Sequence, residues 1–184
     1  MKSLFKTGMA FIFFWCYSLA YAQDFEQPSE KKSLVYFYQS NGTGALAKFS
    51  YYDGKSYLGR FGGKKCLILE CEPGEHVFWV AAENRSFIEA NLLPGKTYII
   101  QVISTVGIFS SAVKLFPIEP SKEKFLRGMK RYMTKNPPIY LNRSDLSLEE
   151  AKLDYFIENG IDKYTRDKEN EKPFRQLLPE YYFN

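Results

Sequence analysis

The side chains best suited to chemistry are few in this 184-residue chain, and the first to consider is its one histidine, His76. A catalytic triad or a histidine-based metal site would need that side chain beside a nucleophile or further ligands. The sequence has neither a Gly-x-Ser-x-Gly turn nor a His-Glu-x-x-His motif. Because His76 follows a turn and opens an apolar run, we expect it to pack or to form hydrogen bonds.

Two cysteines, Cys66 and Cys71, bracket the segment CLILEC, which has the composition of a strand. Five residues of strand separate two Cα atoms by about 16 Å and place the side chains on opposite faces. A disulfide requires Cα atoms within about 7 Å, and a metal or redox pair requires converging sulfurs. The spacing therefore predicts two unpaired, buried thiols.

The sequence DGKS at 53–56 matches the end of a phosphate-binding loop, but Phe49 stands where that loop needs its first glycine. No helix follows to direct its N-terminus at a phosphate. We interpret the segment as a hairpin turn centred on Asp53 and Gly54, two residue types that tolerate positive φ.

Carboxylate pairs can serve a glycosidase, and several glutamates fall in the strand-like region. Most are placed at expected strand ends or on polar faces, where ionised surface side chains belong. They are Glu70, Glu72, Glu75, Glu83 and Glu89. We therefore predict no catalytic residue, no metal ligand and no cofactor.

Aromatic residues make up 17% of the chain, and a group of tyrosines lies on neighbouring predicted strands. Exposed tyrosines side by side can stack on sugar rings or anchor a protein partner. The alternative is that these rings are covered, since aromatic residues suit pleated surfaces. The candidate surface residues are Tyr36, Tyr38, Tyr51, Tyr52 and Tyr57.

Residues 1–22 have the pattern of a secretory signal peptide, with a basic start, an apolar middle and Ala20-Tyr21-Ala22 before the cleavage point. The apolar run from Gly8 is shorter than the roughly 20 residues of an uncleaved anchor. Cleavage would leave 162 of the 184 residues and lower the net charge from +4 to +2, because two lysines are lost. We expect an exported protein, periplasmic or at the cell surface, with no transmembrane segment after cleavage and no nucleic-acid partner.

A polar leader at 23–32 is expected to be flexible, and strand-like segments then follow up to residue 118. Turn signals recur every eight to twelve residues, which is typical of a β-sandwich or barrel. Among them, EPGE at 72–75 and LPGK at 93–96 combine a proline with a glycine, as type II turns require. Residues 33–118 therefore predict an antiparallel β-sandwich of about seven or eight strands.

Residues 119–184 predict two or three helices packed on the sandwich, giving an α+β chain overall. The first opens at Ser121 as N-cap and ends before Pro137-Pro138. Its apolar face comprises Phe125, Met129, Tyr132 and Met133.

A second predicted helix spans 147–160, with a capping box of Ser147 and Glu150 and an end at Gly160. One more helical turn is expected from Pro173.

The order and spacing of three segments resemble a known family. DGKSYLGRF, then CEPGEHVFWVAA, then LPGKTYIIQV are similar to the PEGA-like β-sandwich modules and a related group of secreted bacterial proteins of unknown function. The resemblance covers about residues 33–118 and carries no active-site residues.

This resemblance implies a non-enzymatic module of the bacterial cell envelope with a binding or structural role. Its partner would be an unknown protein or glycan. The alternatives are a carbohydrate-binding module that uses the surface tyrosines and an envelope hydrolase.

Overall fold

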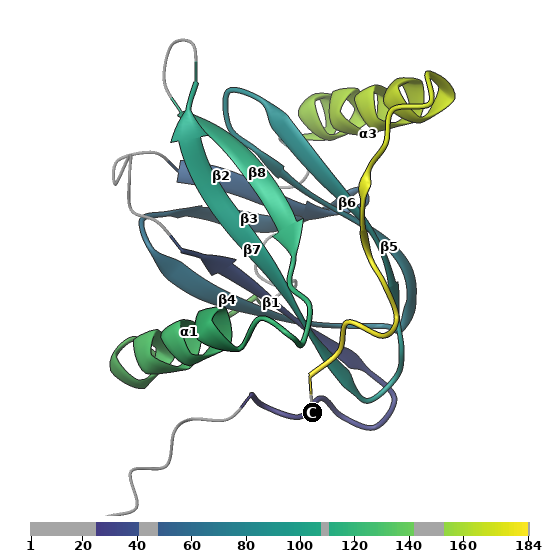
Figure 1. The fold of residues 1–184 in the computed structure, drawn as a ribbon. Helices are drawn as coiled ribbons and strands as arrows, with labels where there is room; N and C mark the ends of the chain where they lie inside the picture. Colours follow the sequence, from purple (N-terminus) through teal and green to yellow (C-terminus); the bar gives the residue numbers. More distant parts are fainter. Residues whose placement is uncertain (1–24, 41–47, 108–110, 142–152, 184) are drawn as a thin grey trace, which may run out of the picture.

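The computed structural model describes residues 25–40, 48–107, 111–141 and 153–183. These residues form two five-stranded sheets and two helices, so the chain is mainly β with an α+β composition (Figure 1). In order across sheet A lie β8 (Ser111–Pro117), β7 (Lys96–Val106), β1 (Ser33–Gln39), β4 (Lys65–Cys71) and β9 (Ile139–Tyr140). In order across sheet B lie β10 (Arg175–Leu177), β6 (Arg85–Leu92), β5 (Gly74–Ala81), β2 (Lys48–Asp53) and β3 (Ser56–Gly62).

The two Pro-Gly turns mark two of the points at which the chain changes sheets. Pro73-Gly74 connects β4 of sheet A to β5 of sheet B, and Pro94-Gly95 connects β6 of sheet B back to β7 of sheet A. Gly74 has φ +112° and Gly95 has φ +68°, a region that L side chains rarely adopt. Each glycine therefore permits the sharp change of direction that the crossing requires.

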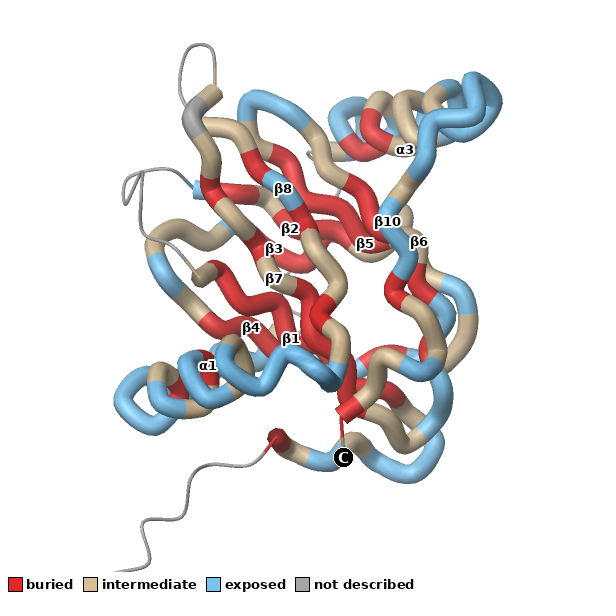
Figure 2. Tube along the Cα trace, in the orientation of Figure 1, coloured by how far each residue is buried: buried red, intermediate tan, exposed pale blue. Residues whose placement is uncertain are grey.

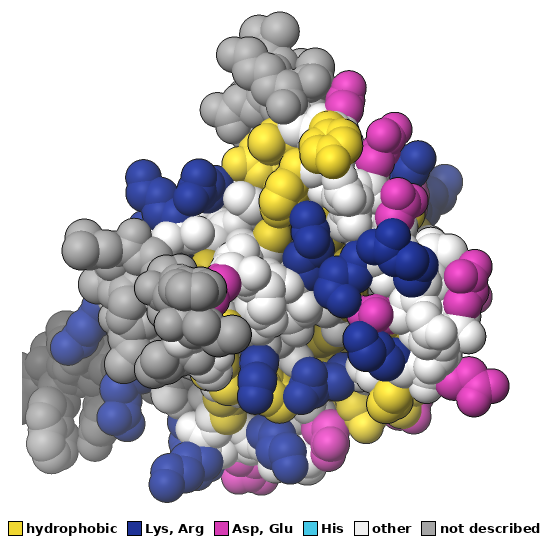
Figure 3. Space-filling view, turned by 90° about the horizontal axis from the view of Figure 1, so that it is seen from above, with side chains coloured by type: hydrophobic (Ala, Val, Ile, Leu, Met, Phe, Trp, Pro, Cys, Tyr) yellow, Lys and Arg dark blue, Asp and Glu magenta, His cyan; other side chains and the backbone are white. Residues whose placement is uncertain are grey.

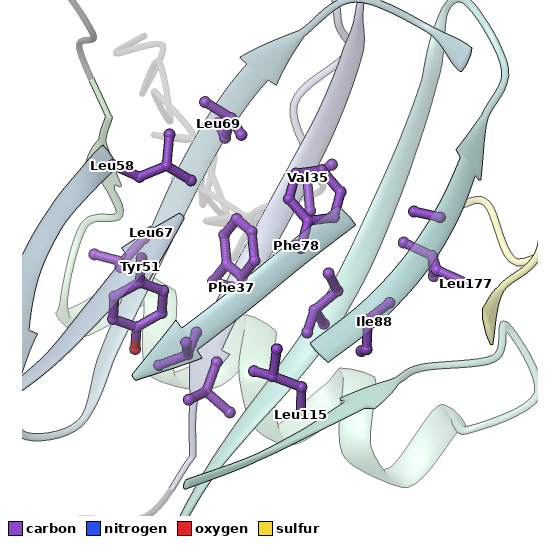
Figure 4. Packing of buried hydrophobic residues seen from close by; sticks show 14 of the residues in the cluster. Val35, Phe37, Tyr51, Leu58, Leu67, Leu69, Phe78, Ile88, Leu115 and Leu177 are labelled. Carbon is purple, nitrogen blue, oxygen red and sulfur yellow. The ribbon is translucent and has the colours of Figure 1, made fainter. Parts of the chain in front are cut away.

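Both sheets contribute to one hydrophobic cluster, which is the main core (Figure 4). Alternate residues along each strand supply it, as the period of two predicts. The predicted faces Ile88-Ala90-Leu92 and Tyr98-Ile100-Val102 both belong to this cluster, with exposures of 5% or less. Figure 2 shows the buried strands inside and the exposed residues on the helices and turns.

Helices cover the outer face of each sheet. Helix α1 (Glu123–Lys135) packs Met129 and Met133 onto sheet A, and Phe125 and Tyr132 flank them, so the predicted apolar face is confirmed. It ends before Pro137-Pro138, also as predicted. Helix α3 (Asp154–Glu169) covers sheet B through Ile157.

Strand direction differs from the antiparallel prediction. Three neighbouring pairs run parallel, namely β1 with β7, β4 with β9 and β6 with β10. The prediction assumed hairpins between successive strands, but the chain repeatedly leaves one sheet for the other. Strands that end up side by side are then distant in sequence, so their relative direction depends on how the connections return.

The hairpin at 53–56 forms one residue later than predicted. Strand β2 ends at Asp53 and β3 begins at Ser56, so Gly54 and Lys55 are the central residues. Gly54 has the positive φ, +55°. Asp53 stays in the strand, where its side chain accepts hydrogen bonds from His76.

The helix boundaries correct two further predictions. Lys122, not Ser121, precedes the first turn of α1, and no side chain caps it. Helix α3 continues through Gly160 to Glu169 instead of ending there. Gly160 allows α3 to approach sheet B closely, because a Cβ at this position would lie 2.5 Å from Cη2 of Trp79. The predicted capping box of Ser147 and Glu150 lies outside the described residues.

The C-terminal tail is not the predicted helical turn. Arg175–Leu177 forms β10, which pairs in parallel with Ile88–Ala90 of β6. The tail then reaches sheet A, where the Phe183 amide donates to the Thr97 carbonyl at 2.8 Å. In Figure 1 it runs from α3 past the edges of both sheets.

The leader at 25–32, predicted to be flexible, is held against sheet A. Phe25 is 6% exposed and its ring meets Tyr36 edge-on at a centroid distance of 5.4 Å. The Glu26 amide donates to the Tyr36 hydroxyl, and the Thr97 hydroxyl donates to the Glu26 carbonyl. One apolar residue in a polar stretch thus provides the anchor that composition did not indicate.

Asn84 joins the edge of sheet A to sheet B. Its side-chain amide donates to the Val113 carbonyl at 2.9 Å and accepts from the Val113 amide at 2.7 Å, as a paired strand would. Ser86 accepts from the Leu115 amide beside it. These contacts satisfy backbone groups of β8 that would otherwise form an open edge.

Replacing Asn84 with alanine should therefore lower the free energy of unfolding by about 1–3 kcal/mol, since two backbone groups lose their partners. Urea unfolding followed by fluorescence measures the loss. The matched control is Asn91→Ala, an exposed asparagine on the same hairpin. A similar fall in the free energy of unfolding for both variants would show that the contact of Asn84 with Val113 does not stabilise the fold.

Candidate functional site

The five candidate tyrosines are all buried and do not form one surface. Their exposures are 1% for Tyr36, 4% for Tyr38, 0% for Tyr51, 1% for Tyr52 and 4% for Tyr57. The first two lie under α1, the third in the core between the sheets, and the last two under α3. The prediction of an exposed tyrosine surface is therefore wrong, because helices distant in sequence cover both outer faces.

The rings of Tyr52 and Trp79 form a stack on the outer face of sheet B, with centroids 3.8 Å apart and planes 8° from parallel. Both residues are almost fully buried, and Gly160 of α3 lies directly against the indole. A sugar needs a free ring face on which to stack. Tyr52 has no such face, and its ring instead forms part of the surface against which α3 packs.

The two cysteines are unpaired and buried, as predicted. Cys66 lies on the outer face of sheet A with its sulfur 3.6 Å from that of Met133, and Cys71 lies in the core between the sheets. Burial raises the pKa of Cys66 to about 12. A thiol that stays protonated at neutral pH is a poor nucleophile and metal ligand.

His76 uses both ring nitrogens within the fold. Nδ1 lies 2.9 Å from Oδ1 of Asp53, and Nε2 lies 2.8 Å from the carbonyl oxygen of Glu72. The ring also stacks on Phe78. The histidine thus links the β2–β3 hairpin to the first Pro-Gly turn, and the hydrogen-bonding role expected for it is confirmed.

A cleft of about 630 Å³ lies beside His76 and is bounded by β5, β6, α3 and the tail; we name it the His76 cleft. Most of its charged side chains bind one another: Asp53 faces His76, and Glu89 faces Lys168. Oε1 of Glu89 accepts from the Tyr164 hydroxyl and from Lys168 Nζ at 2.8 Å, and Oε2 accepts from Gln176 at 2.5 Å. One carboxylate therefore ties α3 and the tail to β6.

The pKa of Glu89 reflects this network. Burial alone would raise it, but the hydrogen bonds from Lys168, Tyr164 and Gln176 prevail and lower it to about 2. The same contacts raise the pKa of Lys168. Glu89 consequently remains ionised at neutral pH and cannot supply the proton that a general acid must donate.

The stability of the fold should therefore fall in acid through Glu89. Its folded pKa lies below the ordinary value of 4.5, so its stabilising contribution is present above about pH 4.5 and is lost as the pH drops towards 2. Glu89→Gln should be less stable than the parent protein at pH 7, with a smaller difference at pH 3. Urea unfolding at both pH values tests this, and a difference that does not change with pH would contradict it.

A second hollow, of about 590 Å³, lies on the outer face of sheet B where α3 begins. Lys48 and Arg60 line it as exposed cations, Ser50 and Ala81 form part of its floor, and Phe156 belongs to its α3 side. We name this hollow the arginine groove. Figure 3 shows Lys and Arg side chains beside hydrophobic ones on the face seen from above.

Strand register explains why the groove is basic. Arg60 pairs with Ser50, Ser50 pairs with Ala81, and Ala81 pairs with Arg85. Directly paired residues share a face, so these four form one row across β3, β2, β5 and β6. Two arginines thus flank two small residues.

Arg85 lies at the inner end of this row. Its guanidinium carbon is 4.7 Å from the centroid of the Phe156 ring, and its Nε is buried with no hydrogen-bond partner among the described residues. Buried polar groups in native proteins normally have partners. The exposed Arg60 and Lys48, with Arg85 in the same row beside them, make the groove the best candidate for a binding site.

Sequence reasoning did not find Arg60 and Arg85. They are 25 residues apart, and nothing in their immediate neighbours distinguishes them from ordinary surface residues. They share a row only because β2 and β5 pair, and no local motif encodes that pairing.

No protein-family model matches the chain, and no curated protein matches it. Neither of the two described helices is long and apolar enough to cross a bilayer. Within the described ranges, no three His, Cys, Asp or Glu side chains gather in a way that would hold a metal ion.

Proposed function

We propose that this chain is an exported, non-enzymatic β-sandwich module that acts in the cell envelope by binding. The proposal rests on the difference between the two hollows. In the His76 cleft, Glu89 binds Tyr164, Lys168 and Gln176, and His76 binds Asp53. The arginine groove instead presents the exposed cations Lys48 and Arg60, with Arg85 in the same row beside it.

The sandwich interpretation is supported by the single core cluster to which both sheets contribute. The PEGA-like interpretation is supported by the two Pro-Gly turns, since each opens a strand and carries the chain into the other sheet. In such an architecture binding residues lie on faces and loops, because the interior is filled by side chains.

The hydrolase alternative fits less well. It would need His76 to accept a proton from a nucleophile, but its nitrogens already face Asp53 and the Glu72 carbonyl. The carbohydrate alternative loses its basis with the burial of the candidate tyrosines.

Expression of the full-length chain with a C-terminal tag in a bacterium, followed by fractionation and N-terminal sequencing, tests the proposal. We expect a product that begins at Gln23, lies outside the cytoplasm and captures an envelope component after crosslinking. An uncleaved product retained in the cytoplasm would contradict the proposed export.

A further inference from the structure

We propose that the arginine groove binds an acidic peptide segment whose carboxylates reach Arg60 and Arg85. This inference deepens the proposed binding role by specifying a ligand class, and it rests on that role. Cationic side chains dominate the groove, with Lys48, Arg60 and the neighbouring Arg85 against Glu83. A ligand of negative charge is the complementary one.

The row of paired residues sets the spacing that such a ligand must match. Arg60 and Arg85 lie on β3 and β6, three strand steps apart in sheet B. Neighbouring strands are about 4.8 Å apart, so the two Cα atoms are separated by roughly 14 Å. The side chains between them, those of Ser50 and Ala81, are small. They therefore leave space for a ligand above the middle of the row.

An extended peptide offers carboxylates at this separation. Residues i and i+4 of an extended chain point to the same side and are about 13 Å apart. A segment of the form Glu-x-x-x-Glu can therefore place one carboxylate at each arginine. Guanidinium groups bind carboxylates through two parallel hydrogen bonds. Because the Nε of Arg85 is buried, the pair at this residue would form through its two terminal nitrogens.

The aromatic rings at the groove favour a peptide over an acidic sugar chain. The Tyr52 ring is 1% exposed and stacked on Trp79, and the Arg85 guanidinium lies over the Phe156 ring. Sugar rings would need an open aromatic face. Phe156 and Leu153 instead offer apolar contact suited to side chains between the two glutamates.

The test is an NMR titration of the ¹⁵N-labelled protein, purified after expression of the full-length chain, with the blocked peptide Glu-Ser-Ala-Ser-Glu. We expect the amide signals of Ser50 and Ala81 to shift on binding. Arg60→Gln and Arg85→Gln should each weaken the affinity by roughly tenfold, since each removes a charge-assisted pair. Arg127→Gln, an exposed arginine on α1 over the other sheet, is the matched control and should change the affinity less than about twofold.

A peptide with glutamine in place of both glutamates should not bind, and one with two adjacent glutamates should bind more weakly than the parent peptide. Circular dichroism and thermal melting of each variant exclude loss of folding as the cause. Equal affinity for the parent and the Arg85→Gln protein would overturn the inference, as would tighter binding of a tri-galacturonate than of the peptide. A protein that is exported and captures an envelope component, yet does not bind the peptide, would refute the inference and leave the proposed function standing.

Discussion

Replacing Leu177 with alanine should lower the free energy of unfolding by about 2–5 kcal/mol, a large loss for a residue seven positions from the C-terminus. Leu177 belongs to the three-residue strand β10, yet it is 1% exposed and lies in the core cluster between the sheets. Truncation removes buried methyl groups and leaves a cavity that the paired strands cannot close. Equilibrium urea unfolding measures the effect.

The adjacent Leu178 provides the control. It is half-buried and does not belong to the core cluster, so Leu178→Ala should cost about 1 kcal/mol or less. Equal losses for the two variants would mean that β10 does not complete the core. A Leu177→Ala protein that fails to fold would still differ from a folded Leu178→Ala protein in circular dichroism, which keeps the comparison decisive.

Gly160→Ala should destabilise the protein by about 1–3 kcal/mol, although alanine is the better helix former. The added methyl group would lie 2.5 Å from Trp79 Cη2. The indole cannot withdraw, because it is fully buried and stacked on Tyr52. Helix α3 must therefore move away from sheet B, and thermal unfolding with near-ultraviolet circular dichroism of the tryptophan reports that movement.

Gly128→Ala tests the same chemical change where space is open. Gly128 lies on the exposed side of α1, and a Cβ there would meet nothing within 4 Å. Alanine should stabilise this helix by about 0.5–1 kcal/mol. Opposite signs for the two glycines are expected, and stabilisation by both substitutions would show that the approach of α3 to Trp79 imposes no constraint.

The features that could be predicted from sequence are those that depend on neighbours along the chain. The two Pro-Gly turns, the alternation in Ile88-Ala90-Leu92 and the apolar face of α1 are all local patterns, and the structure has each of them. The unpaired state of Cys66 and Cys71 follows from strand geometry in the same way. These predictions needed no knowledge of what lies across the sheet.

The predictions that failed required knowledge of what covers a residue. Tyr36 and Tyr52 lie on outward faces of their strands, as exposed residues do, but α1 and α3 cover them. Gly160 has the appearance of a helix end because glycine often ends helices. Here it is needed for contact with Trp79, which is 81 positions away in the sequence.

By itself, the sequence determined where strands β1 to β8, their turns and most of α1 occur, because backbone preference and side-chain alternation act over a few residues. Tertiary structure alone decided that β1 and β7 run parallel, that the tail becomes a strand, and that Arg60 and Arg85 share one row. Each of these depends on which strands meet after the chain has crossed between the sheets. The strand pairing that forms is the one that best buries apolar area over the whole domain. No short segment of the sequence specifies that area.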